Sequence, residues 1–294
     1  MTGDEVDIMY YSDKWQDYRL IDCGGGRRLE SWSGKILVRP DPQAMWDEAG
    51  SPLWKKANAV YHRSNEGGGS WEVRDLPASW QVKYRDLTFA IKPMSFKHTG
   101  IFPEQAANWD FITEKIRSRG GKKVEVLNLF AYTGAATMAA AKAGASVCHV
   151  DAARGMVTWA KENAALCGLE SAPIRYIVDD CRKFIRREIN RGRKYDGIIM
   201  DPPSYGRGPS GEVWRFEEGI GELISLCAQL LSDDPLFFVI SSYTAGVSPS
   251  VPAYILGREL VPRFGGKVEA KELGLKVEST GLMLPCGAST RWER

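Results

Sequence analysis

Residues 124–151, VEVLNLFAYTGAATMAAAKAGASVCHVD, decide the fold class of this chain. An apolar run over 124–130 leads into a turn with a single glycine, Gly134, and an alanine-rich stretch then runs to Gly144. A second apolar run follows at 146–151. This order predicts a strand, a helix and a second strand. Strands that are apolar along their whole length are typical of a parallel sheet with both faces covered.

The same alternation continues toward the C-terminus. Apolar runs predict further strands at 174–179, 196–201 and 236–241, with helical segments between them, and two more strands are expected within 265–286. We therefore expect an α/β fold with a Rossmann-like, seven-stranded, mostly parallel sheet. Ligands of such sheets bind at the carboxyl ends of the strands.

The first part of the chain has a different pattern. Short runs of alternating apolar and polar residues, such as 17–22 and 35–39, are separated by glycine and proline clusters such as 24–26. Such runs predict antiparallel strands. We expect a small antiparallel β domain over 1–95 and the α/β domain over 96–294.

Composition narrows the class of protein. The chain has 294 residues, of which 44% are hydrophobic and 26% charged, which excludes disordered and disulfide-rich proteins. A net charge of +2 is not the signature of a strongly basic nucleic-acid-binding domain, although basic groups could cluster. Six scattered cysteines and three histidines show no metal-ligand spacing, so we expect no metal. Reduced thiols and an acidic start without an apolar segment predict a cytoplasmic protein with no membrane span.

The turn after the first strand of the α/β region indicates the kind of cofactor. Residues 130–134, FAYTG, lack the G-x-G-x-x-G pattern that lets a backbone approach a pyrophosphate. The turn therefore favours a cofactor without phosphates, although it could be an ordinary strand-to-helix turn. Asp151 follows about twenty residues later, where an acidic side chain can accept both hydroxyls of a ribose. Asp151 fits NAD and S-adenosylmethionine (SAM) equally well, or could cap a helix.

Acidic residues also follow the third and fourth of these strands. Asp179 or Asp180 could accept a hydrogen bond from an adenine amino group, or could cap a helix that starts at Cys181. The segment 201–205, DPPSY, is the most specific feature of the chain. Its two prolines predict a rigid turn with exposed carbonyls beside a carboxylate, which suits a planar amino group, and Tyr205 could stack on its ring.

In this order, the motifs resemble those of class I SAM-dependent methyltransferases: FAYTG (130–134), Asp151, Asp179–Asp180 and DPPSY (201–205). From about residue 80 onward, the chain is most similar to the bacterial 23S rRNA cytosine-C5 methyltransferase I family. The stretch KHTGIFPEQ (97–105) resembles the T-G-x-x-x-D-Q segment of that family, which lies over the cofactor.

The resemblance implies SAM as methyl donor, S-adenosylhomocysteine as product, and RNA as partner. It implies catalytic roles for Asp201, Pro202 and Tyr205. The cofactor-binding residues that it implies are Thr99, Ile101, Phe102, Gln105, Phe130, Ala131, Tyr132, Thr133, Gly134, Asp151, Ala152, Asp179, Asp180, Cys181 and Asp201.

The sequence departs from that family at three points. We expect no N-terminal RNA-binding PUA domain. The cysteine that attacks the ring in cytosine-C5 enzymes is replaced after the fifth strand by Ser241–Ser242–Tyr243. The DPPSY segment instead resembles the loop of enzymes that methylate nitrogens conjugated to a ring. Methyl transfer to a base nitrogen or to carbon thus both remain open.

Several alternatives also remain. The substrate could be a protein or a small molecule, or the chain could be an inactive SAM-binding protein that interacts with RNA. The glycine-rich segment 204–216 could be a substrate lid or a plain surface loop. The basic helix expected over 182–194 could meet phosphates or simply face solvent. The oligomeric state, monomer or homodimer, is left open.

Overall fold

A computed structural model describes residues 8–64, 68–207 and 213–294. The chain forms two compact units. The α/β unit holds Ala107–Leu273, Gly287–Arg294 and the described residues up to Tyr10, whereas the β unit holds Tyr11–Ala106 and Gly274–Cys286. These bounds differ from the expected division at residue 95, because a C-terminal segment returns to the β unit.

The α/β unit is built on an eight-stranded sheet in the order β1-β16-β17-β15-β12-β9-β10-β11. Its strands are β1 (Met9–Tyr10), β9 (Glu125–Leu129), β10 (Ser146–Asp151), β11 (Ile174–Val178), β12 (Gly197–Met200), β15 (Phe237–Ser242), β16 (Lys267–Lys276) and β17 (Met283–Glu293). The strands from β15 to β11 are parallel to one another, and β17 is antiparallel to β15.

The expected mostly parallel α/β sheet is confirmed, with two corrections. The sheet has eight strands rather than seven, because β1 adds an edge strand of two residues, too short to show any periodicity. The last strand extends to Glu293 rather than ending by residue 286, because the chain stays extended past Pro285 and Gly287.

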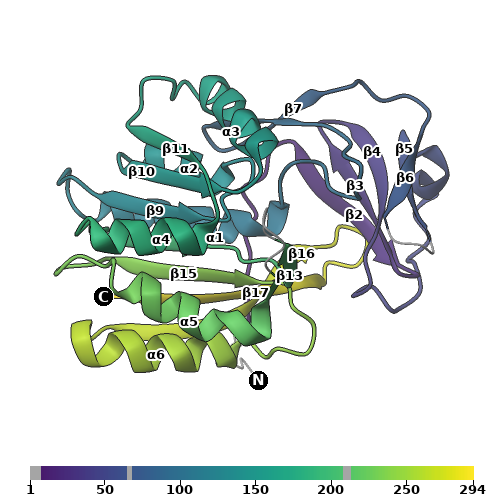
Figure 1. The fold of residues 1–294 in the computed structure, drawn as a ribbon. Coiled ribbons are helices and arrows are strands. Elements are labelled where there is room, and N and C mark those ends of the chain that lie inside the picture. Colours follow the sequence, from purple (N-terminus) through teal and green to yellow (C-terminus); the bar gives the residue numbers. More distant parts are fainter. Residues whose placement is uncertain (1–7, 65–67, 208–212) are drawn as a thin grey trace. The chain divides into compact units, whose positions relative to one another are not determined.

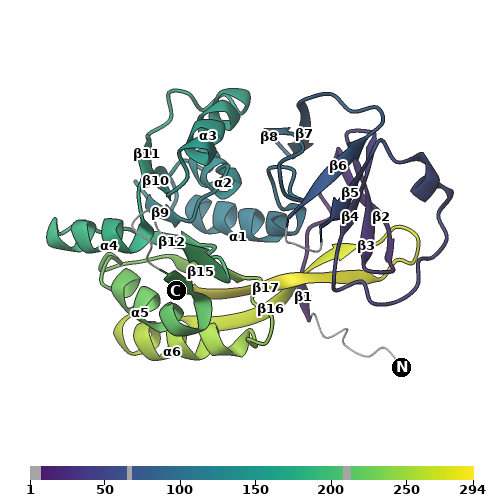
Figure 2. The same ribbon diagram turned by 45° about the vertical axis from the view of Figure 1, so that its right-hand side comes forward.

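Helices cover both faces of this sheet (Figures 1 and 2). One face carries α1 (Ala106–Arg117), α2 (Ala135–Lys142) and α3 (Arg154–Leu166), and the other carries α4 (Cys181–Asn190), α5 (Phe216–Ala228) and α6 (Ser250–Phe264). Successive strand residues alternate between the faces: Val126 packs with α1 and α2, whereas Leu127 packs with α4 to α6. This two-sided burial explains the continuous apolar strands of the sequence.

The β unit contains a five-stranded sheet in the order β2-β3-β4-β5-β6 and a two-stranded hairpin. The strands are β2 (Tyr18–Gly24), β3 (Arg27–Trp32), β4 (Lys35–Pro40), β5 (Ala59–Arg63), β6 (Gly69–Val73), β7 (Trp80–Tyr84) and β8 (Leu87–Ile91). The expectation of a purely antiparallel domain is wrong at one pair, because β4 and β5 are parallel. The connection between them includes the short 3-10 helix Pro52–Lys56 and is long enough for a crossover.

A charged cluster lies in the core of the β unit. The Glu30 carboxylate is fully buried and accepts hydrogen bonds from Arg39 Nε at 2.6 Å and Arg39 Nη2 at 2.8 Å. Tyr18 Oη also donates to Glu30, at 2.9 Å. Burial would raise the pKa of Glu30, but Arg39 and Arg28 together lower it to about 2. The carboxylate is therefore charged in the folded unit at neutral pH.

Candidate functional site

The four candidate turns meet at one edge of the α/β unit. Strands β12, β9, β10 and β11 are consecutive neighbours and parallel, so their carboxyl ends lie along the same edge. The turns that follow them hold 130–134, Asp151, Asp179–Asp180 and Asp201. The fold thus brings together segments that span about 70 residues of sequence. Thr99, Ile101, Phe102 and Gln105 belong to the β unit.

The turn after β9 has an uncommon backbone. Phe130 and Tyr132 have φ angles of +53° and +50°, in the left-handed region that side chains other than glycine rarely adopt. The turn is fastened by hydrogen bonds from Ala131 N–H to the Val150 carbonyl at 3.1 Å and from Gly134 N–H to the Ala131 carbonyl at 3.0 Å. Strained residues persist where the surrounding structure over-determines them, and they cluster at functional sites.

Gly134 ends this turn and cannot be replaced without strain. Its φ is +85°, and a Cβ at this position would lie 2.9 Å from the Ala160 Cβ. Asn163, on the same helix as Ala160, donates from Nδ2 to the Thr133 carbonyl at 2.9 Å and is fully buried. Asn163 was missed at the sequence level, because an asparagine inside an amphipathic helix gives no signal of what it contacts.

Asp151 links the first two turns. Its Oδ2 accepts the Tyr132 N–H at 2.8 Å and its Oδ1 accepts the Ala153 N–H at 2.8 Å. Burial raises the pKa of Asp151, and these two hydrogen bonds oppose that rise. Each carboxylate oxygen keeps a second lone pair, so the group can still accept two ribose hydroxyls. The neighbouring Ala152 is exposed.

The two aspartates after β11 have separate contacts. Asp180 caps α4, because its Oδ1 accepts the Lys183 N–H at 2.9 Å. Asp179 accepts the Asp180 N–H at 2.9 Å and forms an ion pair with Arg187. The capping interpretation is confirmed for Asp180, and a bond from either aspartate to adenine remains a prediction. Cys181, the first residue of α4, is buried, which raises the pKa of its thiol.

The turn after β12 carries the DPPSY segment. The Asp201 N–H donates to the Leu129 carbonyl at 3.4 Å, and the Pro203 carbonyl accepts the Trp214 indole N–H at 2.6 Å. No donor among the described residues reaches the Pro202 carbonyl. Tyr205 is 51% exposed. The turn therefore combines a carboxylate, an acceptor carbonyl and an exposed ring within five residues. These are the three groups for which the sequence predicted catalytic roles.

This geometry agrees with the comparisons with known proteins. The family described as S-adenosylmethionine-dependent methyltransferase matches residues 55–223, more than half of the chain. A solved SAM-dependent methyltransferase from Agrobacterium tumefaciens superposes with a TM-score of 0.90 at 36% identity, covering 98% of this chain and 94% of that one. This chain belongs to the SAM-dependent methyltransferase family.

Relatives named as ribosomal RNA methyltransferases match a shorter part of this methyltransferase. Ribosomal RNA large subunit methyltransferase K/L from Shewanella frigidimarina is 35% identical over 146 residues, 49% of this chain and 20% of that protein. The same enzyme from Chromohalobacter salexigens is 32% identical over 148 residues, 50% of this chain and 18% of that protein. The chain thus spans about a fifth of their length. The solved structure of SMU.776 with S-adenosylhomocysteine has a TM-score of 0.68 at 18% identity, covers 95% of this chain and 76% of that one, and shows the fold alone.

The residues of this methyltransferase suit SAM better than a dinucleotide. Gly134 is the N-cap of α2, and the turn before it contains no second glycine that would bring the backbone close to a pyrophosphate. A half-buried carboxylate, Asp151, stands instead at the end of the next strand. This set of groups fits a nucleoside without phosphates.

The lid suggested for 204–216 stays a prediction. Residues 208–212 lie outside the described part of the chain. Tyr205–Arg207 (β13) pairs with Val213–Arg215 (β14) as an antiparallel hairpin. Trp214, within this segment, is only 8% exposed and belongs to the core cluster that includes residues of α5, and its indole N–H donates to the Pro203 carbonyl. A buried tryptophan anchors this segment at one end.

The basic face of α4 is engaged within the chain. Arg186 pairs with Glu222 at 2.5 Å, and Arg191 pairs with the buried Glu188 at 3.0 Å. Arg187 pairs with a carboxylate at the end of β11. These pairings favour a structural, solvent-facing helix over a phosphate-binding one.

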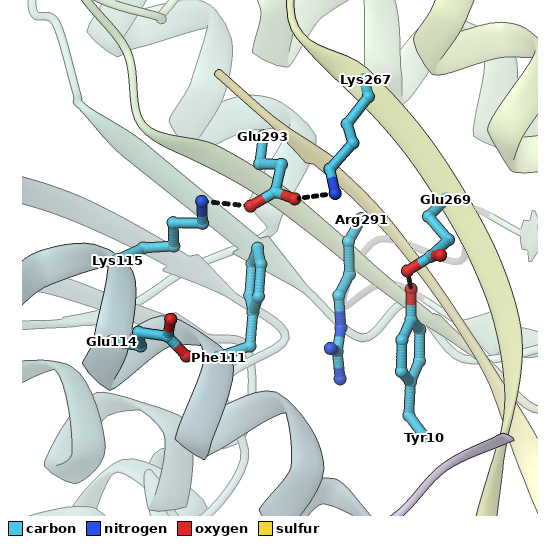
Figure 3. A pocket seen from close by; sticks show the side chains of 8 residues that line it. All are labelled: Tyr10, Phe111, Glu114, Lys115, Lys267, Glu269, Arg291 and Glu293. Carbon is cyan, nitrogen blue, oxygen red and sulfur yellow. Dashed lines mark hydrogen bonds and ion pairs between the residues drawn. The ribbon is translucent and has the colours of Figure 1, made fainter. Parts of the chain in front are cut away.

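A cavity of about 340 Å³ lies at the opposite edge of this unit (Figure 3). Glu293, which pairs with Phe237 at the start of β15, marks that edge. Figure 3 shows Glu293 between Lys115 and Lys267, and Arg291 between two aromatic rings. The lining is Tyr10, Phe111, Glu114, Lys115, Lys267, Glu269, Arg291 and Glu293. Its lining carries three acidic and three basic side chains and includes none of the residues of the candidate turns.

The described residues contain no group of three or more His, Cys, Asp or Glu side chains arranged to hold a metal ion. No helix among them is both long and apolar enough to cross a membrane.

Proposed function

We propose that this SAM-dependent methyltransferase methylates RNA, at a nitrogen of a base. The observation that carries the proposal is the turn 201–205, where the Asp201 carboxylate, the Pro202 carbonyl and the exposed Tyr205 ring follow one strand end. The relatives named as ribosomal RNA methyltransferases support RNA as the substrate class. Ribosomal RNA is the candidate to test first.

The roles of the residues follow from the chemistry of methyl transfer. SAM supplies a methyl group that is already activated by its sulfonium. The protein therefore mainly has to align the acceptor nitrogen with that group. Asp201 and the Pro202 carbonyl accept hydrogen bonds from an amino group, which fixes its lone pair and offsets the positive charge that develops on it. Tyr205 stacks on the base, as exposed aromatic rings do in RNA-binding proteins.

Cofactor recognition is proposed for the other three turns. Asp151 accepts the ribose hydroxyls, Asp179 or Asp180 accepts the adenine amino group with Cys181 beside it, and the backbone of 130–134 lines the amino-acid part. Asp201 lies at the boundary between cofactor and substrate. We also propose that Thr99, Ile101, Phe102 and Gln105 of the β unit contribute, as the family resemblance implies.

The cysteines favour nitrogen over carbon as the acceptor. Carbon-5 methylation of cytosine needs a thiolate that attacks the ring. Five of the six cysteines are buried, and burial raises the thiol pKa of four of these five, Cys23, Cys148, Cys181 and Cys227. The sixth, Cys286, is half-buried and its pKa is also raised. A raised pKa disfavours the nucleophilic thiolate at neutral pH.

The test is transfer of labelled methyl from SAM to ribosomal subunits and total RNA. Asp201→Asn should lower the rate by about 100-fold or more, because an amide has only one acceptor oxygen and carries no negative charge to offset the charge that develops on the nitrogen. Asp233→Asn is the matched control, since Asp233 is exposed and lies before β15 at the other edge of the sheet. Label in protein or small molecules, or a methylated carbon in the digested nucleosides, would contradict the proposal.

A further inference from the structure

Trp214 contacts two of the four candidate turns of the α/β unit and the helix that follows a third. Its indole N–H donates to the Pro203 carbonyl at 2.6 Å, in the DPPSY turn. Its ring lies 6.2 Å from the ring of Phe130, in the turn after β9. The Arg182 guanidinium, in the first turn of α4 after β11, lies 5.6 Å from the Trp214 ring centre. One buried side chain therefore touches turns that are far apart in sequence.

The surroundings hold this ring in one position. Trp214 is 8% exposed and belongs to the core cluster between the sheet and helices α4 to α6. A Cβ on Gly219 would lie 2.3 Å from the Trp214 Cζ3, so α5 leaves a gap that the indole fills. In the β13–β14 hairpin, Trp214 pairs with Gly206, one residue after Tyr205. The hairpin and the helix thus both fix the indole N–H toward Pro203.

The hydrogen bond makes the two proline carbonyls of the DPPSY turn unlike each other. The Pro203 carbonyl accepts the indole N–H, whereas no described donor reaches the Pro202 carbonyl. Prolines supply no backbone N–H, so the turn cannot be fastened by donors of its own at 202 and 203. Donors from outside the turn hold it instead: the Trp214 indole N–H reaches the Pro203 carbonyl, and the Phe216 N–H reaches the Ser204 carbonyl at 3.1 Å.

We propose that Trp214 is a positioning residue for methyl transfer. It acts through Pro203 and Phe130. The indole N–H holds the DPPSY turn so that Asp201 and the Pro202 carbonyl face the acceptor nitrogen. The ring packs against Phe130 and so keeps the DPPSY turn at a constant distance from the turn 130–134. Neither contact involves substrate directly. The role in transfer rests on the proposed function, whereas the effect on the turn does not.

The experiment compares Trp214→Phe with Trp292→Phe. Both tryptophans are buried in the same unit and both donate an indole N–H to a backbone carbonyl, for Trp292 that of Gly265 at 2.9 Å. Phenylalanine keeps an aromatic ring but removes that donor. Trp292 pairs with Phe238 at the start of β15, away from the candidate turns. The two changes therefore carry similar structural costs, and only one releases the DPPSY turn.

Three measurements distinguish a loss of turn positioning from a general loss of protein stability. Amide hydrogen exchange over 199–207 should become faster in Trp214→Phe than in Trp292→Phe. The kcat for methyl transfer should fall by about five- to ten-fold, the value of one hydrogen bond, while the Kd for SAM stays within about two-fold. Trp214→Ala, which also removes the ring beside Phe130, should in addition weaken SAM binding by about ten-fold or more.

Equal exchange rates over 199–207 in Trp214→Phe and Trp292→Phe would overturn the proposal, as would equal kcat values in the two variants. If the unmodified protein transferred no methyl to any RNA, the proposed substrate class would be wrong. The exchange rates and SAM affinities would still decide whether Trp214 holds the turn.

Discussion

Replacing Gly134 by alanine is the sharpest test of the cofactor turn. The φ of +85° costs an alanine about 1–2 kcal/mol. The new Cβ would also lie 2.9 Å from the Ala160 Cβ and 3.3 Å from the Met138 Cε, and overpacking of this kind costs about 1–3 kcal/mol. Together, Gly134→Ala should lower the free energy of unfolding by about 2–5 kcal/mol. The turn can relieve the contact only by moving away from α3, so SAM binding should weaken by about ten-fold or more.

Gly168→Ala is the matched control. Gly168 has a φ of +66°, is exposed, and would place its Cβ with no atom within 4 Å. The free energy of unfolding of Gly168→Ala should fall only by the conformational cost of about 1–2 kcal/mol, and this variant should bind SAM as the unmodified protein does. Adding Ala160→Gly to Gly134→Ala should restore SAM binding, because it removes the atom that the new Cβ meets. Denaturant titration and calorimetry measure both quantities. Equal destabilisation by the two glycine changes, or unaltered SAM binding by Gly134→Ala, would refute this reasoning.

Three further predictions concern single side chains. Tyr205→Ala should lower kcat/KM for RNA about ten-fold with the Kd for SAM unchanged, and Tyr205→Phe should keep most of the activity, because stacking needs the ring alone; equal losses would argue against stacking. The Glu30 pKa of about 2 lies below its ordinary value of 4.5, so its stabilising effect is present above pH 4.5 and lost as the pH falls toward 2. Acid unfolding of Glu30→Gln should therefore be less dependent on pH in that window, and an unchanged profile would rule out the effect. Asn163→Ala should lower the free energy of unfolding by about 1–3 kcal/mol, measured by denaturant titration, because the buried Thr133 carbonyl loses its donor; a loss below 0.5 kcal/mol would show that water replaces it.

The pairing of β4 with β5 shows a limit of local patterns. Alternating residues predicted strands correctly, but the direction of pairing depends on how residues 41–58 cross the sheet. Short β-rich runs separated by turns fit either direction. The two-residue strand β1 was missed for a related reason, since its only support is its pairing with β16.

Single acidic residues left more than one interpretation open at the sequence level. Asp180 could be a cap or a ligand for adenine; the hydrogen bond from the Lys183 N–H shows that it caps α4, and a bond to adenine stays a prediction. Asp151 was expected to bind ribose, and its two backbone donors, Tyr132 and Ala153, show how its carboxylate is oriented. Which atoms surround a carboxylate depends on chain segments that local sequence does not specify.

The sequence by itself determined the alternation of strands and helices and the order of the four strand-end motifs, because apolar periodicity, glycine and proline act over a few residues. The family and the methyl donor could be inferred from that order. Only the tertiary structure decided the contacts of Trp214 and Asn163. Their partners, Pro203 and Thr133, lie 11 and 30 residues away along the chain. Such contacts are selected by packing across the sheet and its helices, and no local pattern encodes them.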